Sequence, residues 1–362
     1  MPPSPRAKQA AARIRQLACL DIGGPQLVPL LLDELHDVFE FDTAGYLHVN
    51  AEQQLEAYMQ DPDVQAIVPI WLDEHMQRHE REVARNFTDA VRCEFGPQLK
   101  EQLMTIPWRQ FQRSDYYNVL LRPLSLQDCV SLIPRLPNGG PVGVFKFYRR
   151  SELFSFQRTH LAELARLEPF LAQALRSRPE PETGTDTLGS AQLVTAIDGR
   201  LLWLSERATP LLALAFGSRW RARSELPDAL KAVLSQLRRL QRGDDTDRLP
   251  QLEVRNAAGR FTIAAKLLWA AAGDERTVGF HLEHRIPRPL RALTALRGLA
   301  LPPRQMTVAY WLAQGLAEPA IAARMGISHN TVVYHRRELY GRLGVGHRHE
   351  LLGLLLGGAG SA

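Results

Sequence analysis

The chain has 362 residues, of which 45% are apolar and 23% charged, so it is long enough for two or three domains with separate cores. Its net charge of +5 permits binding to nucleic acid but does not require it. The three cysteines, Cys19, Cys93 and Cys129, match no metal-ligand spacing, and no apolar run approaches the ~18 residues of a membrane span. With no signal peptide, these features predict a cytoplasmic protein with reduced thiols, no metal, no cofactor and no membrane association.

Residues 1–178 mix helical and extended patterns. One amphipathic helix is expected over 25–39 and a single long one over 64–91, with a strand over 43–49. The stretch DCVSLIPRLPNGGPVGVFKFYRR predicts two strands around an Asn-Gly-Gly turn, and a helix over 155–176 closes the segment. This order, and in particular VGVFKFYRRSELFSFQRTHLAELARLEPFLAQAL, resembles a GAF-like sensory domain.

The segment 177–189 is rich in Pro, Gly, Thr and acidic residues, which predicts a linker. Residues 188–285 follow with two strands flanking an Asp198-Gly199 turn, then helices, then QLEVRNAAGRFTIAAKLLWA and RTVGFHLEHR, which alternate as three more strands. Two strands, helices and three strands is the order of a PAS-like domain, and IDGRLLWLSERA resembles the opening hairpin of that family.

The segment 284–304 contains four prolines, which interrupt regular structure, and it is predicted to be a second flexible join between domains. Four helices are expected after it, over 303–314, 319–325, 329–343 and 348–356. Gly315 and Gly326 end the first two helices, and Ser328 is placed to cap the third. A short helix, a glycine turn and a longer helix is a helix-turn-helix, whose second helix enters the major groove of DNA.

The window 301–356 is identified as a LuxR-type helix-turn-helix domain. The matching residues are Pro303, Arg304, Gly315, Leu316, Ile321, Ala322, Gly326, Ile327, Ser328, Thr331, Val332, His335, Tyr340, Leu343, Gly344, Val345, Arg348 and Glu350. The resemblance implies a four-helix domain in which Val333, Tyr334 and Arg337 meet DNA bases. It also implies that Asn330, Thr331 and Arg342 meet the DNA backbone.

Two residues depart from the family pattern. Val333 stands where the family usually has a basic residue, so it can offer only apolar contact, for example to a thymine methyl. Arg336 stands where the family usually has an apolar residue, and we expect it to contact DNA with Arg337. His335 is predicted to contact phosphate or to serve in helix packing or capping, and Tyr340 to lie in the core.

The predicted fold class is therefore α+β and multidomain. It comprises a GAF-like domain with N-terminal helices (1–178), a PAS-like domain (188–285) and an all-α helix-turn-helix domain (296–362). The predicted function is a DNA-binding transcription regulator, homodimeric through its fourth C-terminal helix, with RNA polymerase as a partner if it activates transcription. The alternatives are an interaction scaffold with a vestigial DNA-binding domain and an enzyme fused to a helix-turn-helix. The sequence holds no phosphate loop, nucleophile elbow or zinc-protease motif.

The regulatory signal is predicted only in outline, as a small molecule or protein partner bound by the N-terminal domains. The sequence WRQFQRSDYYNVL offers the Trp, Tyr and Asp types of autoinducer-binding relatives in a different spacing. Trp71, Trp108, Tyr116 and Tyr117 could therefore line a ligand pocket, or they could be ordinary core residues.

Overall fold

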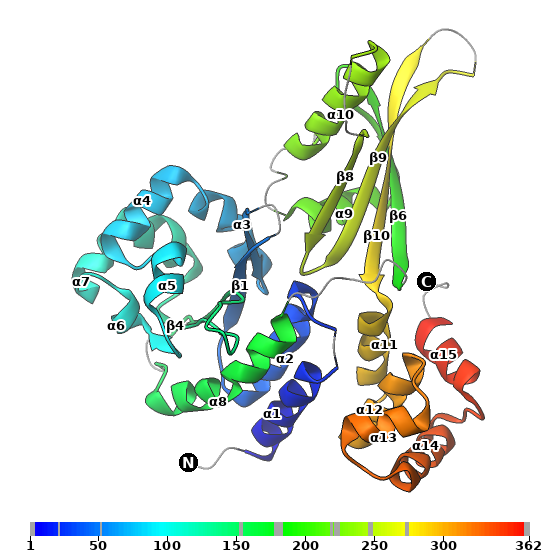
Figure 1. Ribbon diagram of the computed structural model, residues 1–362. Helices are drawn as coiled ribbons and strands as arrows, with labels where there is room; N and C mark the ends of the chain where they lie inside the picture. The colour runs from blue at the N-terminus through cyan, green and yellow to red at the C-terminus, as the bar shows by residue number, and fades with distance from the viewer. Residues whose placement is uncertain are drawn as a thin grey trace.

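The computed structural model describes residues 4–20, 22–50, 53–151, 155–176, 184–217, 220, 225–244, 249–271 and 275–357. Figure 1 shows three parts: a first α/β domain on the left, a second around long strands at the upper right, and a helical domain at the lower right. The fold is thus mixed α and β, with two antiparallel sheets and a helical C-terminal domain. Among the described helices, none combines the length and apolar character needed to cross a bilayer.

The first domain is built on a five-stranded antiparallel sheet of order β2-β1-β5-β4-β3. Its strands are β1 (Thr43–Val49), β2 (Leu55–Met59), β3 (Gln98–Leu99), β4 (Asp128–Leu132) and β5 (Val144–Arg149). Its helices are α1 (Pro5–Ala18), η1 (Pro25–Leu27), α2 (Val28–Val38), α3 (Pro62–Trp71), α4 (Glu74–Val83), α5 (Phe87–Cys93), α6 (Lys100–Leu103), α7 (Trp108–Phe111), η2 (Tyr117–Leu121), η3 (Arg122–Leu124) and α8 (Arg158–Leu175).

Helices cover both faces of this sheet, because successive side chains of a strand point to opposite sides. Phe145 and Phe147 of β5 point into the core shared with α1, α2 and α8. Val144 packs instead in a small cluster with Ala90 of α5, on the side that α3 to α7 cover. The hairpin of β4 and β5 and the closing helix α8 confirm the sequence prediction.

The single long helix expected over 64–91 is wrong. The segment forms α3, α4 and α5, which are separated by two capped breaks. The Asp73 carboxylate accepts the His75 amide at 3.0 Å and begins α4, and the Asn86 amide oxygen accepts the Asp89 amide at 2.9 Å and begins α5. These side chains satisfy amide groups that a helix start leaves without partners, so three short helices can fold over the sheet.

The second domain repeats the strand order of the first, as β7-β6-β10-β9-β8. Its elements are β6 (Thr185–Ala196), β7 (Leu201–Leu204), α9 (Ala208–Phe216), α10 (Asp228–Gln241), β8 (Gln251–Asn256), β9 (Gly259–Trp269) and β10 (Arg276–Pro287). The five predicted strands are all present, and α9 and α10 pack on one face of the sheet around Phe261 and Phe280.

The predicted linker is shorter than expected. Residues 177–183 lie outside the described residues, but β6 already begins at Thr185 and pairs with the end of β10. This pairing supplies ladder hydrogen bonds to residues whose Gly and Thr content suggested irregular structure.

The C-terminal domain contains α11 (Arg288–Arg297), α12 (Pro303–Ala313), α13 (Glu318–Met325), α14 (His329–Leu343) and α15 (Arg348–Leu356). The last four match the predicted helices to within about one residue. The flexible join expected over 284–304 is wrong, because β10 runs to Pro287 and α11 follows directly. Pro289 lies in the first turn of α11, where a missing amide hydrogen costs nothing, and Leu290, Leu293 and Leu296 are buried along one side of the helix.

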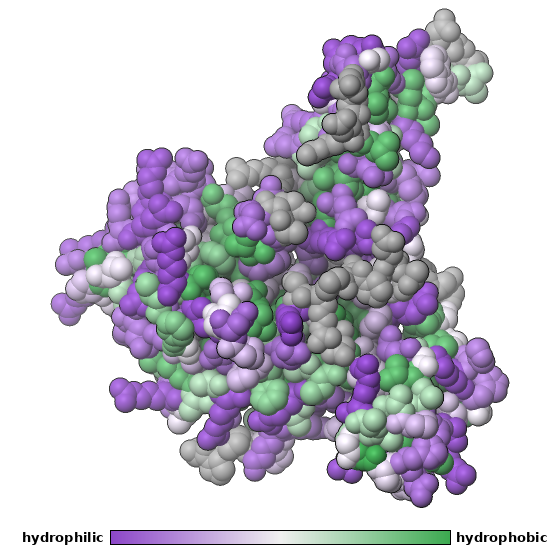
Figure 2. All heavy atoms as spheres, viewed as in Figure 1, coloured by the Kyte–Doolittle hydropathy of each residue, from purple (hydrophilic) through white to green (hydrophobic). Residues whose placement is uncertain are grey.

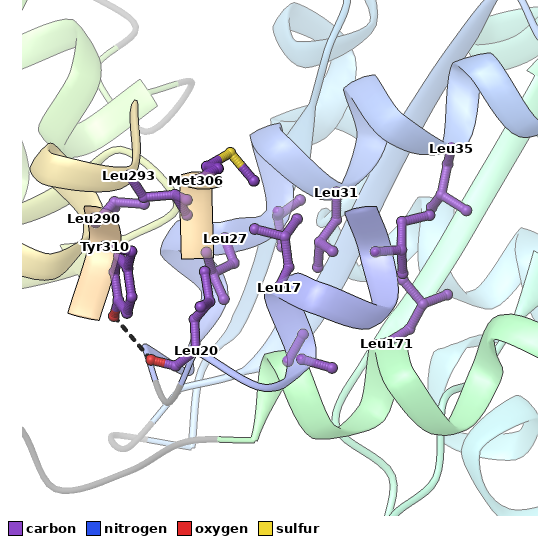
Figure 3. Close-up of a cluster of buried hydrophobic side chains, with 14 of the residues drawn as sticks. Leu17, Leu20, Leu27, Leu31, Leu35, Leu171, Leu290, Leu293, Met306 and Tyr310 are labelled. Atoms are coloured by element: carbon purple, nitrogen blue, oxygen red, sulfur yellow. Dashed lines mark hydrogen bonds between the residues drawn. The ribbon is translucent and has the colours of Figure 1, made fainter. Parts of the chain in front are cut away.

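The first and C-terminal domains share one apolar core. Figure 3 shows side chains of the α1–α2 region meeting those of α11 and α12. Buried members of this core, all less than 9% exposed, are Leu17, Leu20, Leu27, Leu31, Leu290, Leu293, Met306 and Tyr310. We call this contact the α1–α12 seam.

Polar contacts join the same two domains. The Tyr310 hydroxyl donates to the backbone carbonyl of Leu20 at 2.8 Å (Figure 3). The Glu34 carboxylate of α2 pairs with Arg13 of α1 at 2.5 Å and with Arg297 of α11 at 2.7 Å. Since the Glu34 side chain is only 3% exposed, this charge is compensated from both sides of the seam. The helix-turn-helix domain is therefore docked on the first domain.

Candidate functional site

Helices α13 and α14 cross at a short glycine turn. Gly326 follows α13 with φ of 62°, in the left-handed region that glycine adopts without strain. The Ser328 hydroxyl then accepts the amide of Thr331 at 3.2 Å and caps α14. The turn and the cap are both as predicted, and they fix the direction of α14 relative to α13.

Helix α14 has one buried side and one solvent side. Val332 and Leu339 are fully buried in the domain core. Asn330, Tyr334 and Arg337 are exposed, and Tyr334 retains 59% of its surface although it is a large aromatic residue. An exposed tyrosine between polar residues is suited to contact with another polar macromolecule.

The remaining predicted site residues differ in how freely they project. Arg342 is exposed, Thr331 and Val333 are half-buried, and the Thr331 hydroxyl is 2.7 Å from that of Ser328. Within the described residues, the side chains of Arg337 and Arg342 take part in no hydrogen bond or ion pair. Figure 2 shows mainly hydrophilic residues at the lower right of the molecule, where this domain lies. The two guanidinium groups are therefore available to phosphate or base edges.

Arg336 is engaged within the domain. Its guanidinium forms an ion pair with Glu318, in the first turn of α13, and lies 5.8 Å from the centre of the Tyr340 ring. The Nε2 atom of His329 lies 3.1 Å from the Oε2 atom of the same Glu318 carboxylate. Sequence reasoning missed Glu318, because an acidic residue in the first turn of a helix is common and its partners come from the next helix. The pair explains how this chain accommodates Arg336 where an apolar residue is usual.

His335 is a packing residue in this structure. It is half-buried, and its two ring nitrogens reach neither solvent nor a hydrogen-bond partner among the described residues. Tyr340 is half-buried against the core, as predicted.

A second candidate site is a cavity of about 120 Å³ in the first domain, between the sheet and the layer of α3 to α7. Trp71, Trp108 and Tyr116 line it, as the aromatic pattern suggested. Tyr117 is buried beside the cavity and donates its hydroxyl to the Gln127 side chain at 3.2 Å. Three of the four predicted aromatic residues thus share one pocket.

A buried carboxylate organises the aromatic side of this cavity. The Glu80 oxygens accept the Trp71 indole N–H and the Tyr116 hydroxyl, each at 3.0 Å. Burial raises the pKa of Glu80, although nearby Lys146 and these two hydrogen bonds oppose the shift. Burial, together with the Glu80 charge, raises the pKa of Tyr116 well above its usual range. No sequence pattern marked Glu80, because it is one of many polar residues on α4.

Comparison with known proteins supports the assignment of the C-terminal domain. Residues 299–355 match the family model described as bacterial regulatory proteins, luxR family. An HTH-type transcriptional regulator named for the exeN 3′ region of Aeromonas salmonicida is 46% identical over 66 residues. The match covers 18% of this chain and 34% of that protein, so the chain spans about a third of the length of this relative.

Similarity to solved structures is weaker. Escherichia coli SdiA gives a TM-score of 0.32 at 11% identity over 94% of both chains. A phage VqmA–DPO complex gives 0.20 at 18% identity, over 48% of this chain and 84% of the other. The Vibrio cholerae VqmA dimer gives 0.19 at 16% identity, over 48% and 85%. Scores of this size do not establish a shared overall fold, and the assignment rests on the sequence matches and the helix-turn-helix geometry. Residues 299–355 are a helix-turn-helix domain of the LuxR family.

Proposed function

We propose that the protein is a transcription regulator that reads duplex DNA with α14. The observation that supports this most is the solvent side of α14, where Asn330, Tyr334 and Arg337 are exposed. Ser328 caps this helix, and the helix belongs to a LuxR-family domain. A helix presented in this way fits the major groove, where base edges carry a distinct pattern for every base pair.

The residues divide by what their side chains can recognise. Arg337 can donate two hydrogen bonds to a guanine, and Val333 can contact a thymine methyl. Asn330, Thr331 and Arg342 are placed for the DNA backbone, which positions the protein without reading sequence. Arg336 contributes to DNA binding only if its guanidinium leaves Glu318 or reaches a phosphate while paired.

The test is the affinity of the full chain for duplex DNA, measured by fluorescence anisotropy on a panel of sequences at two salt concentrations. Arg337→Ala is expected to cost about 1–3 kcal/mol on the preferred sequence and to relax the preference at one base pair. Arg166→Ala is the matched control, since Arg166 is exposed on α8 of the first domain. An equal loss on every sequence would make Arg337 a phosphate contact, and no loss would remove it from the interface.

The protein is further proposed to act as a homodimer through α15. Leu351 and Leu355 are buried within the domain, but Leu354 is 45% exposed on an adjacent side of the helix. A two-fold contact centred on Leu354 would bring two copies of α14 to half-sites about one helical turn, roughly 34 Å, apart.

Regulation is proposed to pass through the α1–α12 seam. The first domain holds the DNA-binding domain through this seam while the solvent side of α14 stays exposed. The seam therefore governs the position of the domain and its dimerisation rather than access to α14. A small molecule in the cavity of the first domain would act by its different affinity for docked and undocked states. The proposal places the protein in the cytoplasm, with RNA polymerase as partner if it activates.

Removing residues 1–285 tests this regulation. The truncated chain is expected to differ from the full chain in operator affinity or in transcription output. Equal binding and equal output under every condition would leave the N-terminal part as a scaffold, and absence of DNA binding by both forms would favour the scaffold or enzyme alternatives.

A further inference from the structure

The floor of the first-domain cavity carries polar groups from the centre of the sheet. Lys146 and Tyr148 are two residues apart on β5, so both point to the cavity side of the sheet. Cys129 of β4 is the direct cross-strand neighbour of Tyr148 and lines the cavity beside it. Burial raises the pKa of the Tyr148 hydroxyl well above its usual range, so this hydroxyl is a hydrogen-bond donor at neutral pH.

The opposite wall is apolar and aromatic. Val68, Leu103 and Met104 line it together with the rings of Trp71 and Trp108. The cavity of about 120 Å³ is close to the ~150 Å³ of an engineered apolar cavity that accepts benzene. Its size and its aromatic walls suit a single aromatic ring, which gains from edge-to-face contacts.

Of the three cationic side chains that line the cavity, two lie within ion-pair distance of a carboxylate and Lys146 does not. Lys100 lies 3.8 Å from Asp128, and Arg85 lies 3.8 Å from Glu94. Glu80 is held by the two neutral donors described above. Among the described residues, Lys146 makes neither a hydrogen bond nor an ion pair, and its ammonium is beyond ion-pair distance of Glu80.

The Tyr148 hydroxyl likewise has no hydrogen-bond partner among the described residues. Two donors without hydrogen-bond acceptors therefore stand side by side on the floor of a pocket whose other lining residues are mainly apolar. A cation removed from water is costly unless an opposite charge and hydrogen bonds compensate it. An anionic oxygen placed over β5 would satisfy the Lys146 ammonium and the Tyr148 hydroxyl together, because charge-assisted hydrogen bonds are the strong ones.

We infer that this cavity is a binding site for a small aromatic carboxylate, with the ring between Trp71 and Trp108 and the carboxylate on Lys146 and Tyr148. The inference deepens the ligand-binding part of the proposed function and rests on it for its regulatory meaning, but the binding itself can be measured without DNA.

The experiment is isothermal titration calorimetry of the full chain with benzoate, benzamide and benzylamine, which share a size and differ in charge. Benzoate is expected to bind about tenfold or more tightly than benzamide, since hydrogen bonds to charged groups exceed neutral ones by about this factor. Lys146→Met should reduce benzoate affinity to about that of benzamide and leave benzamide affinity within about threefold, which also shows that the pocket has folded. Tyr148→Phe should weaken benzoate about fivefold.

Lys266→Met is the matched control, because Lys266 is exposed on β9 of the second domain, and it should change none of these affinities. Equal affinity for benzoate and benzamide would overturn the inference, as would preference for benzylamine, which would make Glu80 the selecting group. Failure of all three to bind at millimolar concentration would also overturn it. DNA binding by the same samples is assayed separately and tests the proposed function. A protein that binds benzoate but not DNA would contradict the DNA-reading role and leave the inference about the cavity standing.

Discussion

The seam between the first and C-terminal domains predicts a specific effect for Tyr310→Phe. Tyr310 is 1% exposed, and its hydroxyl donates to the Leu20 carbonyl at 2.8 Å. The phenylalanine ring keeps the packing and leaves that carbonyl without this donor, which costs about 1–3 kcal/mol for a buried acceptor. Because about 1.4 kcal/mol corresponds to tenfold in an equilibrium constant, the population of the open seam should rise roughly 5- to 140-fold.

Hydrogen–deuterium exchange with peptide resolution measures this opening directly. Peptides from α1 and α12 should exchange faster in Tyr310→Phe, while peptides of β9 and β10 keep their rates. Tyr340→Phe is the control, since Tyr340 lies in the same domain and its hydroxyl makes no hydrogen bond within the described residues. If both variants exchange alike, the Tyr310 bond does not hold the domains together and the seam is apolar contact alone.

Three further predictions concern other parts of the chain. Burial lowers the pKa of His48 to about 4, so this imidazole is neutral in the folded state and the unfolded chain takes up its proton first as pH falls through about 6.5. Between pH 7 and 4 the free energy of unfolding should therefore drop by about 3 kcal/mol more in the wild type than in His48→Gln, and equal urea-unfolding profiles would contradict this. Gly326→Ala should destabilise the C-terminal domain by about 1 kcal/mol in thermal unfolding, because the left-handed φ of Gly326 disfavours a side chain. Gly341 lies inside α14 with open space around it, so Gly341→Ala should stabilise the domain by about 0.5–1 kcal/mol. Stability changes of the same sign for both variants would refute the backbone argument. Leu354→Glu should convert a dimer to a monomer in sedimentation velocity, and a wild type that is monomeric even on its operator would end the dimer proposal.

The sequence predicted most where local signals are strong. Helix α13 ends at Gly326, and α14 begins after Ser328 and ends at Gly344. These boundaries are set by backbone angles and caps that depend only on neighbouring residues. Alternation and turn glycines likewise located all five strands of the second domain. The segment 64–91 failed because Asp73 and Asn86 interrupt a continuous amphipathic period, and periodicity does not distinguish one helix from three in line.

What the sequence did not reveal depends on partners far along the chain. The predicted flexible join assumed that the C-terminal domain completes its own core, yet Tyr310 bonds to a residue 290 positions earlier. Arg336 and Glu318 form an ion pair across the turn between α13 and α14. Lys146 lines a cavity only because α3 to α7 cover that face of the sheet. The residues expected to touch DNA, Asn330 to Arg342, remain a prediction that the helix-turn-helix geometry accommodates.

The strand order that both sheets share has a consequence for how the chain is made. In each domain the last strand in sequence is the central one and pairs with the first strand, so Gly45 of β1 pairs with Lys146 of β5, about a hundred residues later. At roughly 5–20 residues per second of synthesis, one edge of β1 waits on the order of 5–20 seconds for its neighbour, and β6 waits similarly for β10. Pairings this distant in sequence are slow to form. The two open edges follow one another, because β5 ends at Arg149 before β6 begins at Thr185. The first sheet can therefore close before the second sheet exposes its own unpaired edge, and this order of synthesis keeps the strands of the two domains apart.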